Sequence, residues 1–309
     1  MIRRIPFTLV LVALVLAAWA GCNQVGPGKG SAERELVIVA GQSNAVGFDA
    51  FATELPPDPA DQAVMFWWRV GDPPPDEHDG SSGRAWTHLQ PQPKGTPKVT
   101  ATAEERAKSP RQYGNFKQPA GGFGPEMGFA REWRARDARP LAIIKVAFSG
   151  TDAARDWNPD LTGEGGACYR ALREEATAAI AAARVRGVTL RLRALVWVQG
   201  ESDANRNDAP AYAANLERML ARLRADLEAP AMVALLGVNT RFGNGRNAFM
   251  PEITAQQRAL AARDPRCRYV DTAGAETLAP SHTHFTTQGT LEIGRRFAAA
   301  WRDHEQGKP

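Results

Sequence analysis

The run Leu36-Val37-Ile38-Val39-Ala40, followed at once by Gly41-Gln42-Ser43-Asn44-Ala45, is the stretch that most clearly predicts the fold of this chain. A short series of aliphatic and β-branched residues closed by glycine predicts a buried central strand. Reacting groups in open α/β sheets gather at the carboxyl ends of such strands. Ser43 is therefore a candidate nucleophile, with Gln42 and Asn44 as its neighbours. The alternative is that Ser43 or Asn44 only caps the next segment.

Strands and amphipathic helices alternate along the rest of the chain. The predicted strands span residues 36–40, 64–68, 141–147, 193–198 and 232–238, with a short one at 268–270, and the predicted helices span residues 125–137, 169–184, 209–227, 251–263 and 287–301. This alternation predicts a three-layer α/β/α fold of the flavodoxin-like type, with a central, mainly parallel five-stranded sheet. Residues 71–118, rich in proline, glycine and serine, interrupt the pattern, and we expect them to form a long loop at the active-site rim.

Composition limits the class of protein. The 309 residues are 43% hydrophobic and 23% charged, which is typical of a soluble globular protein, and we expect a single domain over residues 35–304. The net charge of +4 comes from scattered arginines and not from a basic block, which argues against a nucleic-acid partner. Cys168 and Cys267 form either a disulfide or two buried free thiols, and their spacing does not indicate a metal site.

The first 22 residues have the layout of an export signal. Arg3 and Arg4 precede the apolar residues 5–20, and Gly21-Cys22 follows. Cys22 resembles the lipidated residue of bacterial lipoproteins, so we expect a lipid anchor as the protein's one membrane contact and residues 23–34 as a tether. The protein would then be periplasmic or at the cell surface. Ala18-Trp19-Ala20 also fits ordinary signal cleavage, which would release a soluble secreted protein.

Two later segments add polar side chains. Leu195–Val198 predicts another buried strand, and Gln199, Glu201 and Asp203 follow it, on the same rim as Ser43. The amide of Gln199 suits an oxyanion, because it can donate hydrogen bonds without carrying charge. Glu201 is a carboxylate that could orient an imidazole. Both carboxylates could instead cap the helix that follows.

A third segment, Ser281–Gly289, lies just before the last predicted helix and contains His282 and His284. Imidazole is the usual general base for a serine nucleophile. A histidine in the loop that opens a helix is well placed to face the end of a neighbouring strand. Either histidine could instead be a surface or capping residue.

The three segments resemble those of the SGNH hydrolase superfamily, in particular the sialate O-acetylesterase-like proteins and the family 6 carbohydrate acetyl esterases, which include acetyl xylan esterases. The similarity covers the chain from Glu35 to Trp301 and takes in Gly122–Ala130, Ile144–Thr151 and Ile293–Ala298. The resemblance implies Ser43 as nucleophile and His284 as general base. It implies an oxyanion hole formed by the Ser43 amide, Gly150 and Gln199, and no metal or organic cofactor.

One position departs from the family pattern. The family commonly has aspartate three residues before the catalytic histidine, where this chain has Ser281. Some members use the glutamate of the Gln-Gly-Glu block instead, which makes Glu201 the predicted triad acid and Asp271 a weaker candidate. The alternatives are a dyad of Ser43 and His284 alone, or a protein that has lost its activity.

The resemblance implies an exported serine esterase that removes O-acetyl groups from carbohydrate, such as acetylated xylan or acetylated sialic acid, through an acetyl-serine. A catalytically impaired carbohydrate-binding lipoprotein and a carbohydrate O-acetyltransferase stay open as alternatives. Four tryptophans near the predicted rim could either stack on sugar faces or pack in the core: Trp67, Trp68, Trp86 and Trp157. The sequence does not predict the oligomeric state.

Overall fold

The structure is a computed structural model that describes residues 32–71, 80–95 and 116–308. The predicted signal segment with Cys22, most of the tether and most of the long loop at residues 71–118 lie outside the described residues. The chain from Glu33 onward forms one compact unit. No helix in the described ranges is long and apolar enough to cross a membrane.

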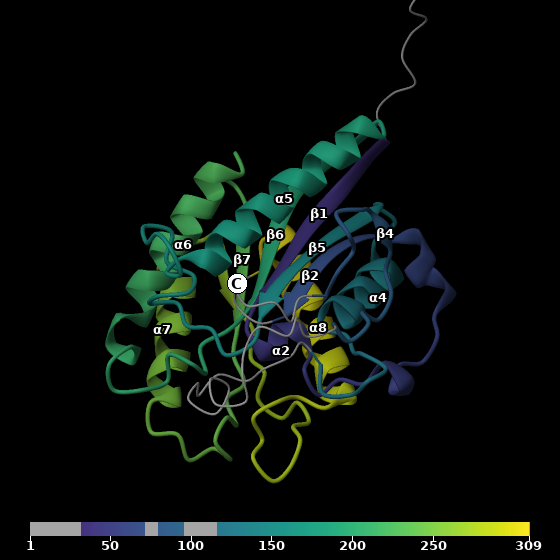
Figure 1. Ribbon diagram of the computed structural model, residues 1–309. Helices are drawn as coiled ribbons and strands as arrows, with labels where there is room; N and C mark the ends of the chain where they lie inside the picture. Colours follow the sequence, from purple (N-terminus) through teal and green to yellow (C-terminus); the bar gives the residue numbers. More distant parts are fainter. Residues whose placement is uncertain (1–31, 72–79, 96–115, 309) are drawn as a thin grey trace, which may run out of the picture. The chain divides into compact units, whose positions relative to one another are not determined.

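The centre of this unit is a mainly parallel sheet with the strand order β3-β2-β5-β1-β6-β7-β8 (Figure 1). Its strands are β1 (Ala32–Gly41), β2 (Met65–Gly71), β3 (Gly80–Ser81), β4 (Thr87–His88), β5 (Leu141–Phe148), β6 (Val188–Val198), β7 (Val233–Gly237) and β8 (Cys267–Tyr269). The six predicted strands are all present. The count of five main strands is too low because β8 joins the sheet and the two-residue strands β3 and β4 pair antiparallel with β2. Strands that short leave no periodic signal in a sequence.

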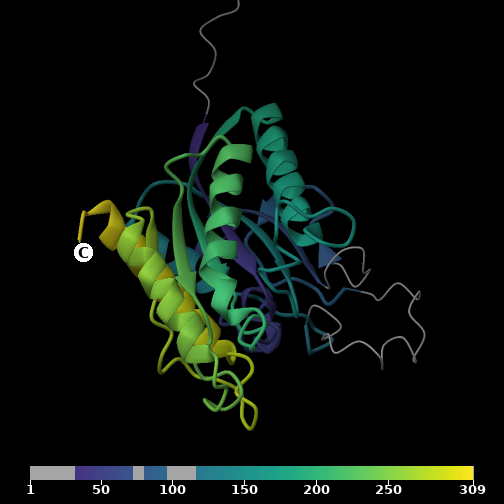
Figure 2. The ribbon, with the colours of Figure 1, turned by 90° about the vertical axis from the view of Figure 1, so that its left-hand side faces the viewer.

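The five predicted helices are also present, as α4 (Glu126–Arg136), α5 (Ala167–Val185), α6 (Tyr212–Asp226), α7 (Met250–Arg263) and α8 (Thr287–Glu305). A four-residue helix, α2 (Ser43–Val46), follows β1, and short 3-10 turns lie at Ala52–Glu54, Pro59–Ala63 and Ala209–Ala211. The view in Figure 2 shows the long helices α5, α6 and α7 side by side along one side of the sheet.

The central strand β1 is buried on both faces, which explains why its sequence is apolar without alternation. Leu36, Ile38 and Ala40 pack in one core with side chains of α5, α6 and α7. Val37 and Val39 pack in a second core with side chains of α4 and α8. The continuous apolar run is therefore the sequence signature of a strand between two helical layers.

The four tryptophans considered for sugar stacking are buried, with 0 to 9% of their surface exposed. Trp67 and Trp68 enter opposite cores, as neighbours on a strand must. The indole N–H of Trp86 donates to the Ala179 carbonyl, and that of Trp157 donates to Thr151 Oγ1. All four serve packing. Cys168 and Cys267 are buried free thiols and form no disulfide with each other.

One ion pair lies inside the core, between Lys145 on β5 and Glu126 at the start of α4, and both side chains are fully buried. Lys145 Nζ donates to Glu126 Oε1 at 2.9 Å, to Gln92 Oε1 at 2.7 Å and to the Val46 carbonyl at 2.8 Å. Burial lowers the pKa of Lys145, although the carboxylate opposes the shift. The ammonium thereby ties the end of α2 to β5 and α4.

Breaking this pair on one side should be more costly than removing it altogether. We expect Glu126→Met to lower the free energy of unfolding by about 3–5 kcal/mol, because Lys145 keeps a buried charge without its carboxylate. The double variant Glu126→Met/Lys145→Met should recover at least about half of that loss. Urea unfolding measures both values.

The matched control is Glu132→Met, on the same helix but partly exposed and paired with Arg136 and Arg302. This substitution should lower the free energy of unfolding by no more than about 1 kcal/mol. A double variant as unstable as Glu126→Met alone would show that the lost hydrogen bonds dominate and that the unpaired charge does not.

Candidate active site

The turn after β1 places Ser43 at the carboxyl end of the sheet. Gly41 has φ 138°, and a Cβ there would lie 2.1 Å from the Val198 carbonyl oxygen, so only glycine fits this close approach to β6. The next amide, of Gln42, donates to that same carbonyl at 3.0 Å. Ser43 then opens α2, which ends at Gly47 with φ 86°. The nucleophile turn is thus fixed against the neighbouring strand.

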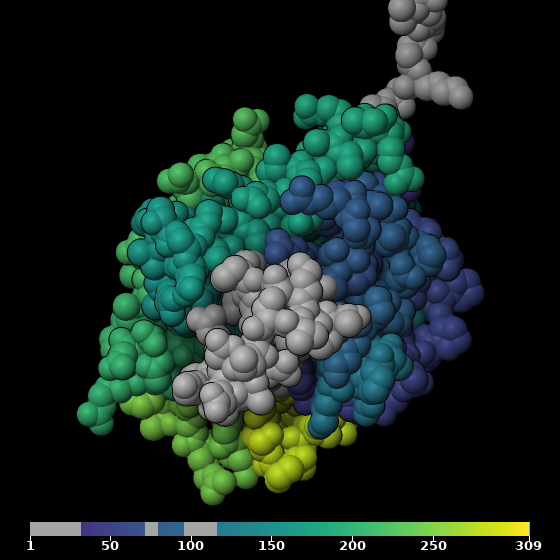
Figure 3. Space-filling model, in the orientation of Figure 1, coloured from purple at the N-terminus to yellow at the C-terminus, as the bar shows by residue number. Residues whose placement is uncertain are grey.

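His284 reaches Ser43 from the opposite end of the chain. It lies in the loop before α8, which projects at the bottom of Figure 1 and whose yellow residues surface at the lower edge of Figure 3. The Leu278 amide donates to the His284 carbonyl at 2.9 Å and holds this loop. Nε2 of His284 lies 3.0 Å from Ser43 Oγ, across 241 positions of sequence. The imidazole is therefore within reach of the hydroxyl proton.

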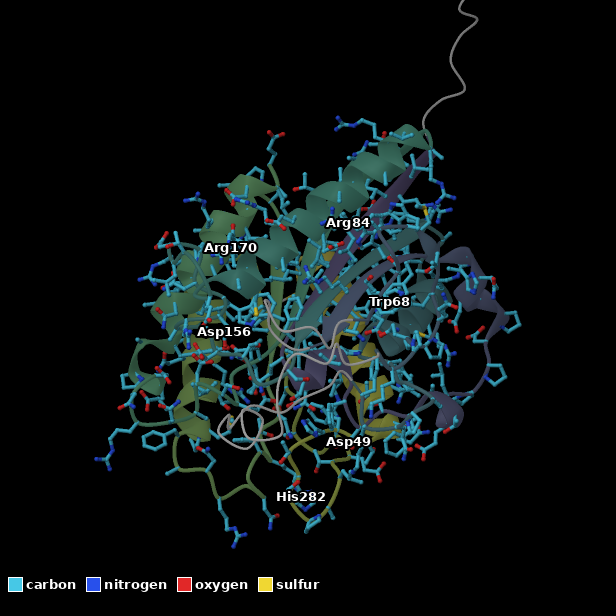
Figure 4. The ribbon with its side chains drawn as sticks, in the orientation of Figure 1. Asp49, Trp68, Arg84, Asp156, Arg170 and His282 are labelled. Atoms are coloured by element: carbon cyan, nitrogen blue, oxygen red, sulfur yellow. The ribbon has the colours of Figure 1, made fainter. Side chains whose placement is uncertain are left out.

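The carboxylate beside the imidazole belongs to Asp49. Its Oδ2 lies 2.7 Å from His284 Nδ1, and its side chain is 6% exposed. Two turn hydrogen bonds fold the chain back to this position, from the Phe48 amide to the Ser43 carbonyl and from the Ala50 amide to the Gly47 carbonyl. Figure 4 shows Asp49 at the same lower end of the molecule as His282. Asp49 is not among the site residues that the sequence predicts.

The environment of Asp49 keeps it ionised. Burial on its own would raise the pKa of its carboxyl, but the hydrogen bond with His284 and the charges of His284 and Lys117 outweigh that effect. The pKa of Asp49 is therefore below its ordinary value. An ionised carboxylate on Nδ1 leaves Nε2 as the nitrogen that can take a proton from Ser43.

Glu201, the predicted acid, is buried but does not contact the imidazole, so that prediction needs correction. Its Oε1 accepts from Asn44 Nδ2 at 2.7 Å and from the Asn239 amide at 3.2 Å. Burial raises the pKa of its carboxyl, and these hydrogen bonds oppose the shift. The reason is geometric: Glu201 follows β6, and Asn44 stands between it and the histidine loop.

Asn44 in turn forms hydrogen bonds with the backbone on both sides of His284. Its Nδ2 donates to the Thr283 carbonyl at 3.1 Å, and its Oδ1 accepts from the Phe285 amide at 3.1 Å. The ring of Phe48 packs on the imidazole at 4.9 Å between centroids. Glu201 thus reaches the histidine loop through Asn44 and through Asn239, whose Nδ2 donates to the Thr283 carbonyl at 3.1 Å.

The remaining candidate acid, Asp271, lies away from the histidine. Its carboxylate accepts from Arg258 Nη2 at 3.3 Å and from the Ala273 amide at 2.9 Å. Ser281 stands in the family's aspartate position, and its carbonyl accepts from the Asn244 amide. Neither residue contacts His284.

Gln199 also differs from its predicted role. Its side chain is fully buried, and Nε2 lies 2.5 Å from Asp203 Oδ2, 3.1 Å from the Thr151 carbonyl and 3.3 Å from Gln42 Oε1. Two amide hydrogens cannot serve three acceptors and an oxyanion as well. Gln199 instead joins the loops after β5 and β6.

Asp203 completes that junction. Both of its carboxylate oxygens accept from the Ala153 amide at 3.0 Å. Burial raises the pKa of Asp203 to about 7, although the hydrogen bonds from Gln199 and Ala153 oppose the shift. Near neutral pH this carboxyl is therefore partly protonated, in a place where a full charge would be poorly solvated.

Three other groups near Ser43 can donate to an oxyanion. The Ser43 amide is the first of a helix, so it has no intrahelical acceptor, and the Gly150 amide follows the neighbouring strand β5 in a turn with φ 68°. Oε1 of Gln42 accepts from Gln199 Nε2 and from the amides of Gly200 and Ser202 at 3.2–3.3 Å. These donors fix the orientation of the Gln42 amide group. Its Nε2 has no hydrogen-bond partner among the residues that the structure describes.

The structure therefore brings together Ser43, His284, Gln42 and Asn44 from the predicted set and adds Asp49. The one signal for Asp49 in the sequence is an acidic side chain isolated in the otherwise apolar stretch Ala45–Ala52 that follows Ser43. Within the described ranges, no group of three His, Cys, Asp or Glu side chains has metal-binding geometry. The serine, imidazole and carboxylate have the arrangement that activates a nucleophile for acyl transfer.

Comparison with known proteins places this geometry in a family. Residues 33–303 match the profile of the carbohydrate esterases described as sialic acid-specific acetylesterases. A curated relative, "Probable carbohydrate esterase At4g34215" of Arabidopsis thaliana, is 27% identical over 184 residues, which are 58% of this chain and 64% of that protein. The match thus spans less than two thirds of the relative's length.

Solved structures share the fold. The crystal structure of the same Arabidopsis thaliana protein has a TM-score of 0.59 at 19% identity, with 87% of this chain and 98% of that chain covered. NanS has a TM-score of 0.55 at 16% identity, with 90% and 99% covered. XAC1771, a carbohydrate acetylesterase from Xanthomonas citri, has a TM-score of 0.54 at 16% identity, with 89% and 57% covered. These likenesses show a shared α/β architecture.

The family match covers nearly all of the described chain, and the nucleophile turn, the histidine loop and the sheet edge that joins them fall within it. This protein belongs to the sialic acid-specific acetylesterase family of carbohydrate esterases.

Proposed function

We propose that this protein is an exported serine esterase that removes O-acetyl groups from carbohydrate through an acetyl-serine intermediate. The observation that carries the proposal is the unbroken chain of contacts from Ser43 Oγ through both ring nitrogens of His284 to Asp49 Oδ2, at 3.0 and 2.7 Å. Asp49 supplies the carboxylate that Ser281 cannot, which removes the reason to regard the protein as an inactive carbohydrate-binding lipoprotein.

In the first half of the reaction, Ser43 Oγ attacks the acetyl carbonyl carbon as His284 Nε2 takes the hydroxyl proton. Asp49 holds Nδ1–H and stabilises the imidazolium that forms. The tetrahedral intermediate collapses, the bond to the sugar oxygen breaks, and His284 returns the proton to that oxygen. The products are the sugar hydroxyl and acetyl-Ser43.

In the second half, water takes the place of the sugar. His284 removes a proton from the water as its oxygen attacks the acetyl carbonyl, and the ester bond to Ser43 then breaks. The proton passes to Ser43 Oγ, and acetate leaves. The three donors that we place at the oxyanion in both halves are the amides of Ser43 and Gly150 and the side-chain amide of Gln42.

The roles of the two buried carboxylates can be separated by neutral, nearly isosteric substitutions. We expect Asp49→Asn to lower kcat by about 10² to 10⁴, because the imidazolium loses its counter-charge and its tautomer is no longer fixed. Glu201→Gln keeps an oxygen for Asn44 and the Asn239 amide, so kcat should fall less than about tenfold. Steady-state hydrolysis of p-nitrophenyl acetate gives both values.

Ser43→Ala is the control, since it should abolish turnover and labelling by a fluorophosphonate probe. Asp49→Asn and Glu201→Gln should both keep their thermal unfolding transition. If folded Glu201→Gln loses more kcat than Asp49→Asn does, then Glu201 and not Asp49 is the acid of the triad.

The oxyanion assignment rests on the amide of Gln42, and one substitution tests it. Gln42→Glu keeps an acceptor oxygen for the Gly200 and Ser202 amides but replaces the donor NH₂ by oxygen. We expect kcat to fall by about 10² to 10³ with little change in KM, because the donor acts on charge that appears only in the transition state. An unchanged kcat would exclude Gln42 from the oxyanion hole.

The substrate class is part of the proposal and is supported by the family. The matched profile describes sialic acid-specific acetylesterases, and XAC1771 is named a carbohydrate acetylesterase. On this chain, Arg241 is an exposed cation on the loop after β7, with Nη2 3.4 Å from His282 Nε2. It is the residue we would substitute first if an acidic sugar proves to be the substrate.

Acetate release from acetylated xylan and from O-acetylated sialic acid tests the function directly, with Ser43→Ala as the blank. We expect release from one of them, and a drop on that substrate alone with Arg241→Met if the sugar is acidic. Acetyl transfer to an added acceptor sugar, without free acetate, would identify an O-acetyltransferase. Binding of either polymer without turnover or probe labelling would identify a carbohydrate-binding protein.

Export is proposed from residues 1–22 alone, whose order of charged, apolar and small residues is that of a signal segment. We propose lipidation at Cys22 and a membrane anchor through it. Palmitate labelling of the protein expressed in bacteria tests this. Labelling that persists in Cys22→Ser would refute the site, and an unlabelled secreted protein would indicate ordinary cleavage.

A further inference from the structure

A lysine stands next to the oxygen of Asp49 that does not face the histidine. Lys117 Nζ lies 3.3 Å from Asp49 Oδ1, and its side chain is half exposed, whereas that of Asp49 is 6% exposed. Oδ1 is buried, and the ammonium forms an ion pair with it. Asp49 thus contacts the His284 imidazole through Oδ2 and the Lys117 ammonium through Oδ1.

The position of Lys117 is fixed through its backbone. Its amide donates to the carbonyl of Phe48, the residue before Asp49, at 3.0 Å. Its own carbonyl accepts from Lys94 Nζ at 3.2 Å. The backbone of Lys117, from which the ammonium reaches Asp49, is therefore held beside the triad.

We propose that Lys117 is a positioning residue that acts through Asp49, holding its carboxylate beside His284 and thereby setting the pH dependence of the reaction. This rests on the proposed function of Asp49 and His284. In the described ranges, the other titratable groups around this pair are Glu201, which acts through Asn44, and His282, which bonds to Thr277 Oγ1. Apart from the imidazole itself, the positive charge that the described residues place against the carboxylate is that of Lys117.

The sign of the effect follows from Coulomb's law. Asp49 attracts the proton on the imidazole, and the ammonium on its other side partly cancels that attraction. Removing the ammonium should therefore favour the imidazolium. The fall of kcat/KM at low pH, which we call the acid limb of the profile, should then occur at higher pH. Because Lys117 is half exposed and screened by solvent, we expect a shift of about 0.5 to 1 pH unit.

The experiment compares pH profiles of kcat/KM for p-nitrophenyl acetate in the full protein. Lys117→Met should move the midpoint of the acid limb to higher pH by the expected shift. Lys117→Arg keeps the charge, so its midpoint should equal that of the wild type. The matched control is Lys308→Met, which removes another exposed lysine, paired with Asp303 near the end of the chain. Its acid limb should coincide with that of the wild type.

A second measurement does not depend on turnover. In a Ser43→Ala background, NMR titration of the His284 ring should show a higher midpoint with Lys117→Met, and almost no difference when Asp49→Asn is also present. If the esterase proposal itself fails, the wild type will not hydrolyse the ester, yet this titration can still be read. Lys117→Met with lower kcat but an unshifted limb and midpoint would overturn the proposal and leave Lys117 a structural role.

Discussion

The contact between Ser43 Oγ and His284 Nε2 is the constraint on which the rest of the site depends. The two residues are 241 positions apart, so the contact exists only if the whole sheet is assembled. The strand β1 must run between β5 and β6 to bring Ser43 to the sheet edge, and the loop before α8 must return to that edge. The apolar run of β1 and the glycine that ends it therefore serve catalysis as directly as they serve stability.

Around this contact, buried polar side chains hold backbone in place. Asn44 binds the chain on both sides of His284, and Glu201 binds Asn44. Gln199 joins the loops after β5 and β6, and Lys145 holds the end of α2. Each of these groups would be costly to bury without its partners, so the network specifies one arrangement. Polar residues that look catalytic in the sequence thus turn out to position others.

The carboxylate that contacts His284 comes from a part of the chain where the family resemblance does not place it. The family's usual aspartate lies on the histidine loop, where this chain has Ser281. Here the carboxylate comes from the segment after the nucleophile and reaches the same ring nitrogen, at 2.7 Å. An imidazole needs only a negative charge on Nδ1 and does not require it from a particular loop. The new position also brings Asp49 next to Lys117.

The sequence by itself determined the alternation of strands and helices, the nucleophile turn and the histidine segment, because local periodicity and turn residues leave a signal over a few positions. It also contained the family resemblance. Only the tertiary structure decided that Asp49 and not Glu201 meets the imidazole, that the amide nitrogen of Gln199 already has acceptors, and that the four tryptophans are core residues. Each of these depends on which side chains from distant strands face each other, and a carboxylate or an amide has the same appearance in a sequence whichever way it points.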